Sequence, residues 1–104
     1  MATYNKLVRD KIPAIIEANG EVPNVRILSN EEWTLALRTK IQEEVREYLE
    51  NPCLEEMADI LEVLHGLLSA SDRTWEQLET ARVTKRMERG GFDDRLWLIS
   101  TDPI

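Results

Sequence analysis

Carboxylate residues at helical spacing are the feature of this chain that points most directly to chemistry. Glu43, Glu44 and Glu47 form the pattern EExxE, and Glu56 and Asp59 form the pattern ExxD. Residues three or four apart lie on one face of an α-helix, so each group can direct carboxylates toward one point. Converging carboxylates repel one another unless a cation lies between them, and Mg²⁺ and Mn²⁺ prefer oxygen ligands. The spacing therefore predicts a divalent-cation site, for Mg²⁺ first and Mn²⁺ as the alternative.

The helical rotation of about 100° per residue ranks these carboxylates by their expected burial. Glu44 falls at the edge of an apolar stripe, Glu47 about one step further round, and Glu43 on the solvated side. Glu56 falls inside the apolar sector of the next helix, and Asp59 borders it. A carboxylate on an apolar face is costly unless it is paired or ligates a metal. The competing interpretation is a pair of solvated acidic faces with basic partners one turn away.

Two basic clusters are candidates for binding phosphate groups. Lys6 and Arg9 lie near the start of the chain, and Lys85 and Arg89 lie just before a Gly-Gly pair. Enzymes that catalyse phosphoryl chemistry commonly combine a divalent metal with Lys and Arg side chains. Surface charges that interact with a helix dipole are the other interpretation.

Four helices are expected to position these residues. The pattern predicts helices over 8–19, from Ser29-Asn30 to about Glu50, from Asn51-Pro52 to about Ser69, and from 71–74 to Gly90-Gly91. Ser29 and Glu32 fit a capping box, whereas Asn51 and Pro52 fit an N-cap and first helical position. The tight connection between the middle helices predicts an antiparallel hairpin.

Packing along this hairpin is expected to follow two apolar stripes. Their members are Leu37, Ile41, Val45 and Tyr48 on one helix, and Leu54, Met57, Ala58, Leu61, Leu64 and Leu68 on the next, widened by Ile60, Val63 and Leu67. Residues 95–99 are compatible with a short strand that pairs with 25–28. The predicted fold is therefore a mainly α bundle of about four helices with a minor two-stranded β element.

Size and composition restrict the classes of protein that remain. The chain has 104 residues, 42% hydrophobic and 32% charged, which predicts one soluble domain over 1–104 that gains stability from oligomerising. A net charge of −7 argues against nonspecific nucleic-acid binding. No apolar run approaches the length of a membrane helix, no signal peptide is evident, and one cysteine allows neither an intramolecular disulfide nor a CxxC metal site. The expected location is the cytoplasm.

Four segments carry a resemblance to a known family. They are YNKLVRDKIP at 4–13, EEVRE at 43–47, EMADILEVL at 56–64 and KRMERGGF at 85–92, which together span most of the chain. The chain resembles the MazG-like, all-α nucleoside triphosphate pyrophosphohydrolases, and more closely their small single-domain branch, which is described as phosphoribosyl-ATP pyrophosphohydrolase-like.

The resemblance implies hydrolysis of the α–β phosphoanhydride of a nucleoside triphosphate, releasing a nucleoside monophosphate and pyrophosphate. It implies Mg²⁺ ligation by Glu44, Glu47, Glu56 and Asp59, with Glu43 positioning or activating water. Glu43 or Glu47 would then take the proton. It also implies a homodimer or homotetramer with the site near the subunit interface.

Two alternatives remain beside this interpretation. One is a noncatalytic helical module that binds a nucleotide or a partner, and the other is phosphoribosyl-ATP hydrolysis. The first rests on a short spacing, since only eight residues (48–55) separate Glu47 from Glu56. This interval is shorter than is usual in the family by about one helical turn. The second is disfavoured because YNKLVRDKIP is unlike that enzyme.

Overall fold

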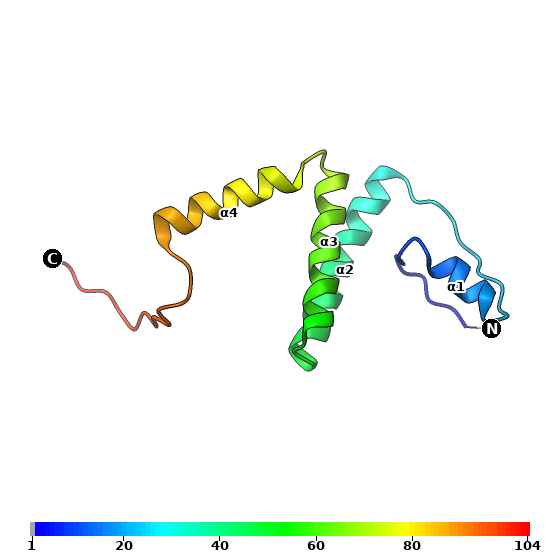
Figure 1. Ribbon diagram of the computed structural model, residues 1–104, viewed down its shortest axis with the longest axis horizontal. Helices are drawn as coiled ribbons and strands as arrows, with labels where there is room; N and C mark the ends of the chain where they lie inside the picture. The colour runs from blue at the N-terminus through cyan, green and yellow to red at the C-terminus, as the bar shows by residue number, and fades with distance from the viewer. Residues whose placement is uncertain (1) are drawn as a thin grey trace. The chain divides into compact units, whose positions relative to one another are not determined.

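The computed structural model describes residues 2–104, and its regular structure is helical throughout (Figure 1). The helices are α1 (Ile12–Ala18), α2 (Asn30–Glu50), α3 (Leu54–Ala70) and α4 (Trp75–Arg89). The chain divides into two compact units, the first ending at Arg73 and the second spanning Thr74–Ile104. Within residues 2–104, no helix has both the length and the apolar character needed to cross a membrane. The mainly α prediction is confirmed.

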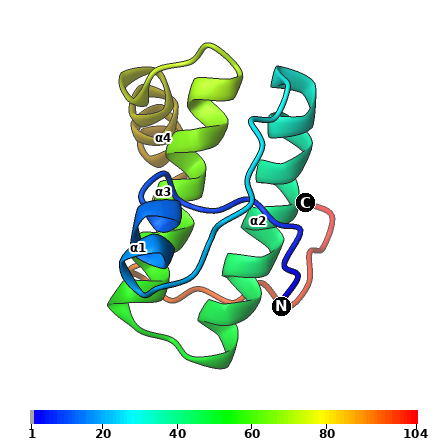
Figure 2. The same cartoon turned by 90° about the vertical axis from the view of Figure 1, so that its right-hand side faces the viewer.

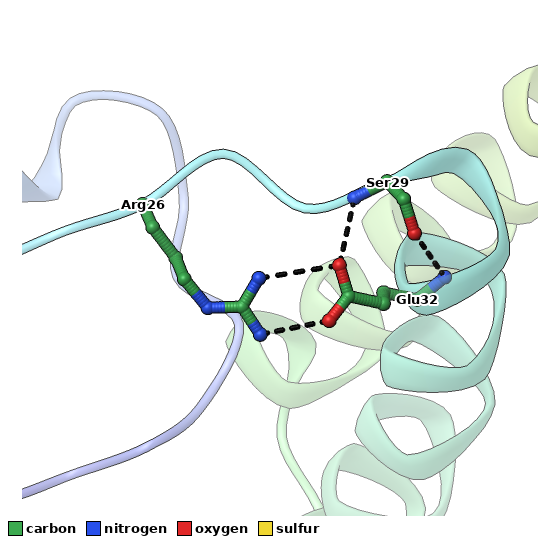
Figure 3. A network of polar contacts seen from close by, with 3 residues as sticks. All are labelled: Arg26, Ser29 and Glu32. Carbon is green, nitrogen blue, oxygen red and sulfur yellow. Dashed lines mark hydrogen bonds and ion pairs between the residues drawn. The ribbon is translucent and has the colours of Figure 1, made fainter.

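The start of α2 is fixed by the capping box that the sequence predicts. The Glu32 backbone N–H donates to Ser29 Oγ at 3.1 Å, and the Ser29 N–H donates to Glu32 Oε1 at 3.0 Å (Figure 3). Arg26 forms a bidentate contact with the Glu32 carboxylate, donating from Nη1 to Oε1 at 3.2 Å and from Nη2 to Oε2 at 2.8 Å. The two bonds between Ser29 and Glu32 satisfy N–H groups that the start of a helix leaves free, and Arg26 holds the Glu32 carboxylate in place. Thr74 and Gln77 form the same box at the start of α4.

The Glu32 carboxylate should make α2 sensitive to acid. Hydrogen bonds from Arg26 and then from Ser29 lower the pKa of Glu32 to about 2, from an ordinary value of 4.5. Because the folded pKa lies below the unfolded one, this contribution is present above about pH 4.5 and is lost as the pH falls toward 2. We expect the melting-temperature difference between the wild type and Glu32→Gln to shrink over that interval. A difference independent of pH would contradict the assignment.

Helices α2 and α3 lie side by side as an antiparallel hairpin (Figures 1 and 2). The most deeply buried apolar side chains among the described residues belong to these two helices: Leu37 of α2 is 5% exposed and Val63 of α3 is 7% exposed. Gly66 lets the backbone of α3 approach closely, because a Cβ at that position would lie 2.8 Å from Leu37 Cδ2. The predicted hairpin is confirmed, and it holds the core of the first unit.

The connection between the two helices differs from the predicted one by two residues. Asn51 ends α2, where its N–H donates to the Glu47 carbonyl at 3.0 Å, and α3 begins after Cys53 as N-cap. The prediction that Asn51 caps α3 and Pro52 opens it was therefore wrong. The backbone of Asn51 cannot end α2 and cap α3 at the same time. The chain therefore reverses through 51–53 before α3 starts.

The first helix is shorter than predicted, since 8–11 precede it. Pro13 has no N–H and its ring clashes with a carbonyl four residues earlier, so Pro fits only in the first turn of a helix. In the structure the Arg9 carbonyl instead accepts from the Ile12 N–H at 3.0 Å. This turn sets the start of α1 at Ile12.

The predicted β element is absent, since neither 25–28 nor 95–99 has strand structure. Val25, Ile27 and Trp97 are 65%, 97% and 88% exposed. A two-stranded ribbon without a packed face has little stability in water. The two segments belong to separate units.

Only part of the apolar stripe predicted for α3 is buried within the chain. Val63 on its widened side is buried, whereas Leu54, Met57 and Leu61 are 76%, 52% and 42% exposed. These three residues, spaced by three and four positions, form one exposed apolar face of α3.

Candidate metal centre

Four carboxylates from the hairpin meet near its connecting loop. Glu44, Glu47, Glu56 and Asp59 each offer one oxygen, and these oxygens all lie within 4.8 Å of one another. Glu44 and Glu47 belong to the last two turns of α2, and Glu56 and Asp59 to the first two turns of α3. Because the chain reverses through 51–53, the short interval between the two motifs brings them together. We call this group the carboxylate cluster.

Two oxygens of the carboxylate cluster are buried without a hydrogen-bond partner among the described residues. They are Oε2 of Glu44 and Oε2 of Glu56, and the whole Glu44 residue is only 7% exposed. A buried charged oxygen that has lost its water is costly unless another group compensates it. Four converging oxygen donors with two unsatisfied atoms fit a hard divalent cation such as Mg²⁺ or Mn²⁺.

The local electrostatics also favour a cation. Burial raises the pKa of Glu44, and the adjacent Glu47 carboxylate raises it further, against the opposing charge of Lys40. Burial likewise raises the pKa of Glu56, followed by the charges of Glu47 and Asp59. The net result is that Glu44 and Glu56 bind protons more readily than isolated carboxylates do.

The same effects predict how metal-free stability should vary with pH. Glu44 and Glu56 have folded pKa values above the ordinary 4.5, so their contribution is fully present below that pH and is lost as the pH rises through the folded values. We expect the melting temperature in EDTA to fall as the pH rises from about 4.5 toward neutrality. Mg²⁺ competes with protons, so it should raise the melting temperature more at pH 8 than at pH 5. An equal Mg²⁺ effect at both values would argue against the cluster as the binding site.

Two basic side chains touch the carboxylate cluster. Arg9 Nη2 donates to Asp59 Oδ1 at 2.6 Å, and Lys40 Nζ lies 3.5 Å from Glu44 Oε1 and 3.6 Å from Glu43 Oε2. Sequence reasoning missed Lys40, although its position four residues before Glu44 is a usable signal. It placed Arg9 at a phosphate, but nothing local in the sequence indicates a partner 50 residues away.

The other predicted site residues lie outside the four-carboxylate group. Glu43 is 35% exposed in its side chain and faces Lys40. Lys6 lies over the Tyr4 ring, with Nζ 5.8 Å from its centroid. Lys85 and Arg89 lie on α4 in the second unit, near an Arg86–Asp93 ion pair of 3.1 Å.

Comparison with known proteins gives one partial similarity. A stretch of 42 residues, 40% of this chain, is 50% identical to an uncharacterized protein of Mycolicibacterium smegmatis. The match spans 43% of that protein, which is less than half its length. No protein-family model matches the chain. No solved structure matches it significantly.

Proposed function

We propose that this protein is a Mg²⁺-dependent nucleoside triphosphate pyrophosphohydrolase of the MazG-like type, acting in the cytoplasm. The observation that supports this most strongly is the carboxylate cluster, in which two buried oxygens have no partner among the described residues. The four sequence motifs that resemble the family support the same assignment. The short interval between the acidic motifs does not prevent their carboxylates from meeting.

Each group of residues has a defined part in the proposed reaction. Glu44, Glu47, Glu56 and Asp59 would hold the metal, and Mn²⁺ is an alternative to Mg²⁺. Bound there, the ion would polarise the phosphoanhydride and lower the pKa of a water molecule. Glu43 or Glu47 would accept the proton from that water. Lys6, Arg9, Lys85 and Arg89 would bind the phosphate oxygens as negative charge develops on them.

Identification of the products tests this reaction. We expect a panel of canonical and modified nucleoside triphosphates to give nucleoside monophosphate and pyrophosphate with Mg²⁺, and neither product with EDTA, when analysed by anion-exchange chromatography. Phosphoribosyl-ATP belongs in the same panel. Nucleoside diphosphate with inorganic phosphate would contradict cleavage at the α–β bond. Tight nucleotide binding without any product would favour the noncatalytic module.

A homodimer or homotetramer is part of the proposal. It is supported by the exposed apolar face of α3, formed by Leu54, Met57 and Leu61, because apolar surface of this kind gains free energy when a second subunit covers it.

A charge on this face should therefore change the oligomeric state. We expect light scattering to give a mass of two or four chains for the wild type and of one chain for Leu61→Glu. Burying an unpaired carboxylate in the interface is costly enough to separate the subunits. Circular dichroism should show that the variant keeps its helices, and an unchanged mass would place the interface elsewhere.

A further inference from the structure

An ion pair between Arg9 and Asp59 joins the segment before α1 to the carboxylate cluster. We refer to residues 2–11 as the N-terminal arm. Arg9 Nη2 lies 2.6 Å from Asp59 Oδ1, and the two side chains are 56% and 37% exposed. The helix that follows the arm, α1, contains no buried residue among its seven. The ion pair that joins the arm to the cluster is therefore open to solvent, while Leu7 and Val8 of the arm are half-buried.

The Arg9 guanidinium already supplies part of the positive charge that the cluster requires. It bonds one oxygen of the carboxylate that also belongs to the four converging ligands. A guanidinium keeps its charge throughout the accessible pH range, so it leaves this position by moving rather than by losing a proton. A divalent cation brings a larger charge to the same carboxylates. A cation bound there would therefore compete with Arg9 for the Asp59 carboxylate.

We propose that the N-terminal arm responds to the metal: Arg9 holds Asp59 in the metal-free protein, and a divalent cation in the carboxylate cluster releases it. This proposal rests on the proposed function, because it requires the cluster to bind a metal. Once released, the guanidinium would be free to donate its N–H groups to phosphates of a substrate held by the metal. The arm would thus offer its phosphate-binding residue only when the cofactor is present.

Competition of this kind has a measurable and reciprocal consequence. An exposed ion pair adds little stability, so its removal should change metal affinity by only about two- to five-fold. By linkage, the metal must weaken the Arg9–Asp59 contact by the same factor. The direction of the change in metal affinity distinguishes the two possible roles of Arg9. If Arg9 merely oriented a metal ligand, its replacement would weaken metal binding by about 10–100-fold.

The first test is a Mn²⁺ titration, followed by electron paramagnetic resonance of the free ion. We expect Arg9→Gln to bind Mn²⁺ about two- to five-fold more tightly than the wild type. Lys11→Gln is the matched control, since it removes the same charge from the same arm and its residue makes no side-chain capping bond. Lys11→Gln should stay within twofold of the wild type. Equal affinity for the wild type and Arg9→Gln, or weaker binding by Arg9→Gln, would overturn the proposal.

The second test reports the arm directly, by tryptic cleavage after Arg9 in the wild-type protein. We expect Mn²⁺ to accelerate this cleavage two- to five-fold, and Asp59→Asn to be cleaved rapidly with or without Mn²⁺. Slower cleavage with Mn²⁺ would overturn the proposal. If the wild type binds Mn²⁺ and the arm does not respond, only this inference fails. If the wild type binds no Mn²⁺, both this inference and the proposed function fail.

Discussion

Asp59→Asn should reduce pyrophosphate release by at least about 100-fold while leaving the helical fold intact. Asn keeps the shape of the side chain but replaces one carboxylate oxygen with an NH₂ group that cannot ligate Mg²⁺, and it removes the negative charge that the ion requires. The substitution removes one charge from the carboxylate cluster, so metal-free folding should not suffer from added repulsion. Release from a good triphosphate substrate is the measurement, with circular dichroism to monitor the helices.

The control for this variant is Asp93→Asn. Asp93 is also paired with an arginine, Arg86, at 3.1 Å, but it lies in the second unit and outside the carboxylate cluster. Its replacement removes the same charge and the same kind of ion pair, so pyrophosphate release should change less than about twofold. Full activity in Asp59→Asn would contradict the account, whatever Asp93→Asn does.

Glu44→Gln should stabilise the metal-free protein and abolish its response to Mg²⁺. Glu44 is 7% exposed, its Oε2 has no hydrogen-bond partner within residues 2–104, and burial raises its pKa. A neutral amide of the same size removes the cost of burying a charged oxygen without a partner. We therefore expect the free energy of unfolding in EDTA to rise by about 1–2 kcal/mol. The wild type should regain stability from Mg²⁺, by about 2.7 kcal/mol at a concentration of 100 Kd. Glu44→Gln should show almost none of this gain.

Thermal melts with EDTA and with Mg²⁺ measure both halves of this prediction. Glu79→Gln is the matched control: Glu79 lies on α4 with Arg82, which donates to both of its carboxylate oxygens, and it lies outside the cluster. Its substitution should give no gain in EDTA and should keep the Mg²⁺ response of the wild type. A Glu44→Gln protein that is less stable in EDTA, or that keeps the full Mg²⁺ response, would show that Glu44 is an ordinary buried acid.

Local chemistry explains what could be predicted from the sequence. The capping box of Ser29 and Glu32 involves residues three apart, so the local sequence is sufficient to predict it. The burial of Glu44 follows from helical rotation, since the apolar positions of α2 show which side faces α3. Glu56 was placed among apolar side chains by the same reasoning, and its Oε2 is buried.

What could not be predicted depends on contacts between distant residues. The apolar side chains of α3 extend around much of the helix, so the sequence does not indicate that Val63 is buried and Leu54 is exposed. The Arg9–Asp59 contact joins residues 50 apart, and no spacing rule relates them. The start of α3 was misplaced because Asn51 satisfies the end of one helix as readily as the start of another.

Crystals soaked in Mn²⁺ would test the central claim most directly, by anomalous scattering at the manganese absorption edge. We predict one strong peak per chain within coordination distance of oxygens from Glu44, Glu47, Glu56 and Asp59. Such a peak would establish that the hairpin is a metal centre. A saturating soak without a peak there, with Glu44 and Glu56 still unpartnered, would contradict the metal site and the hydrolysis that depends on it.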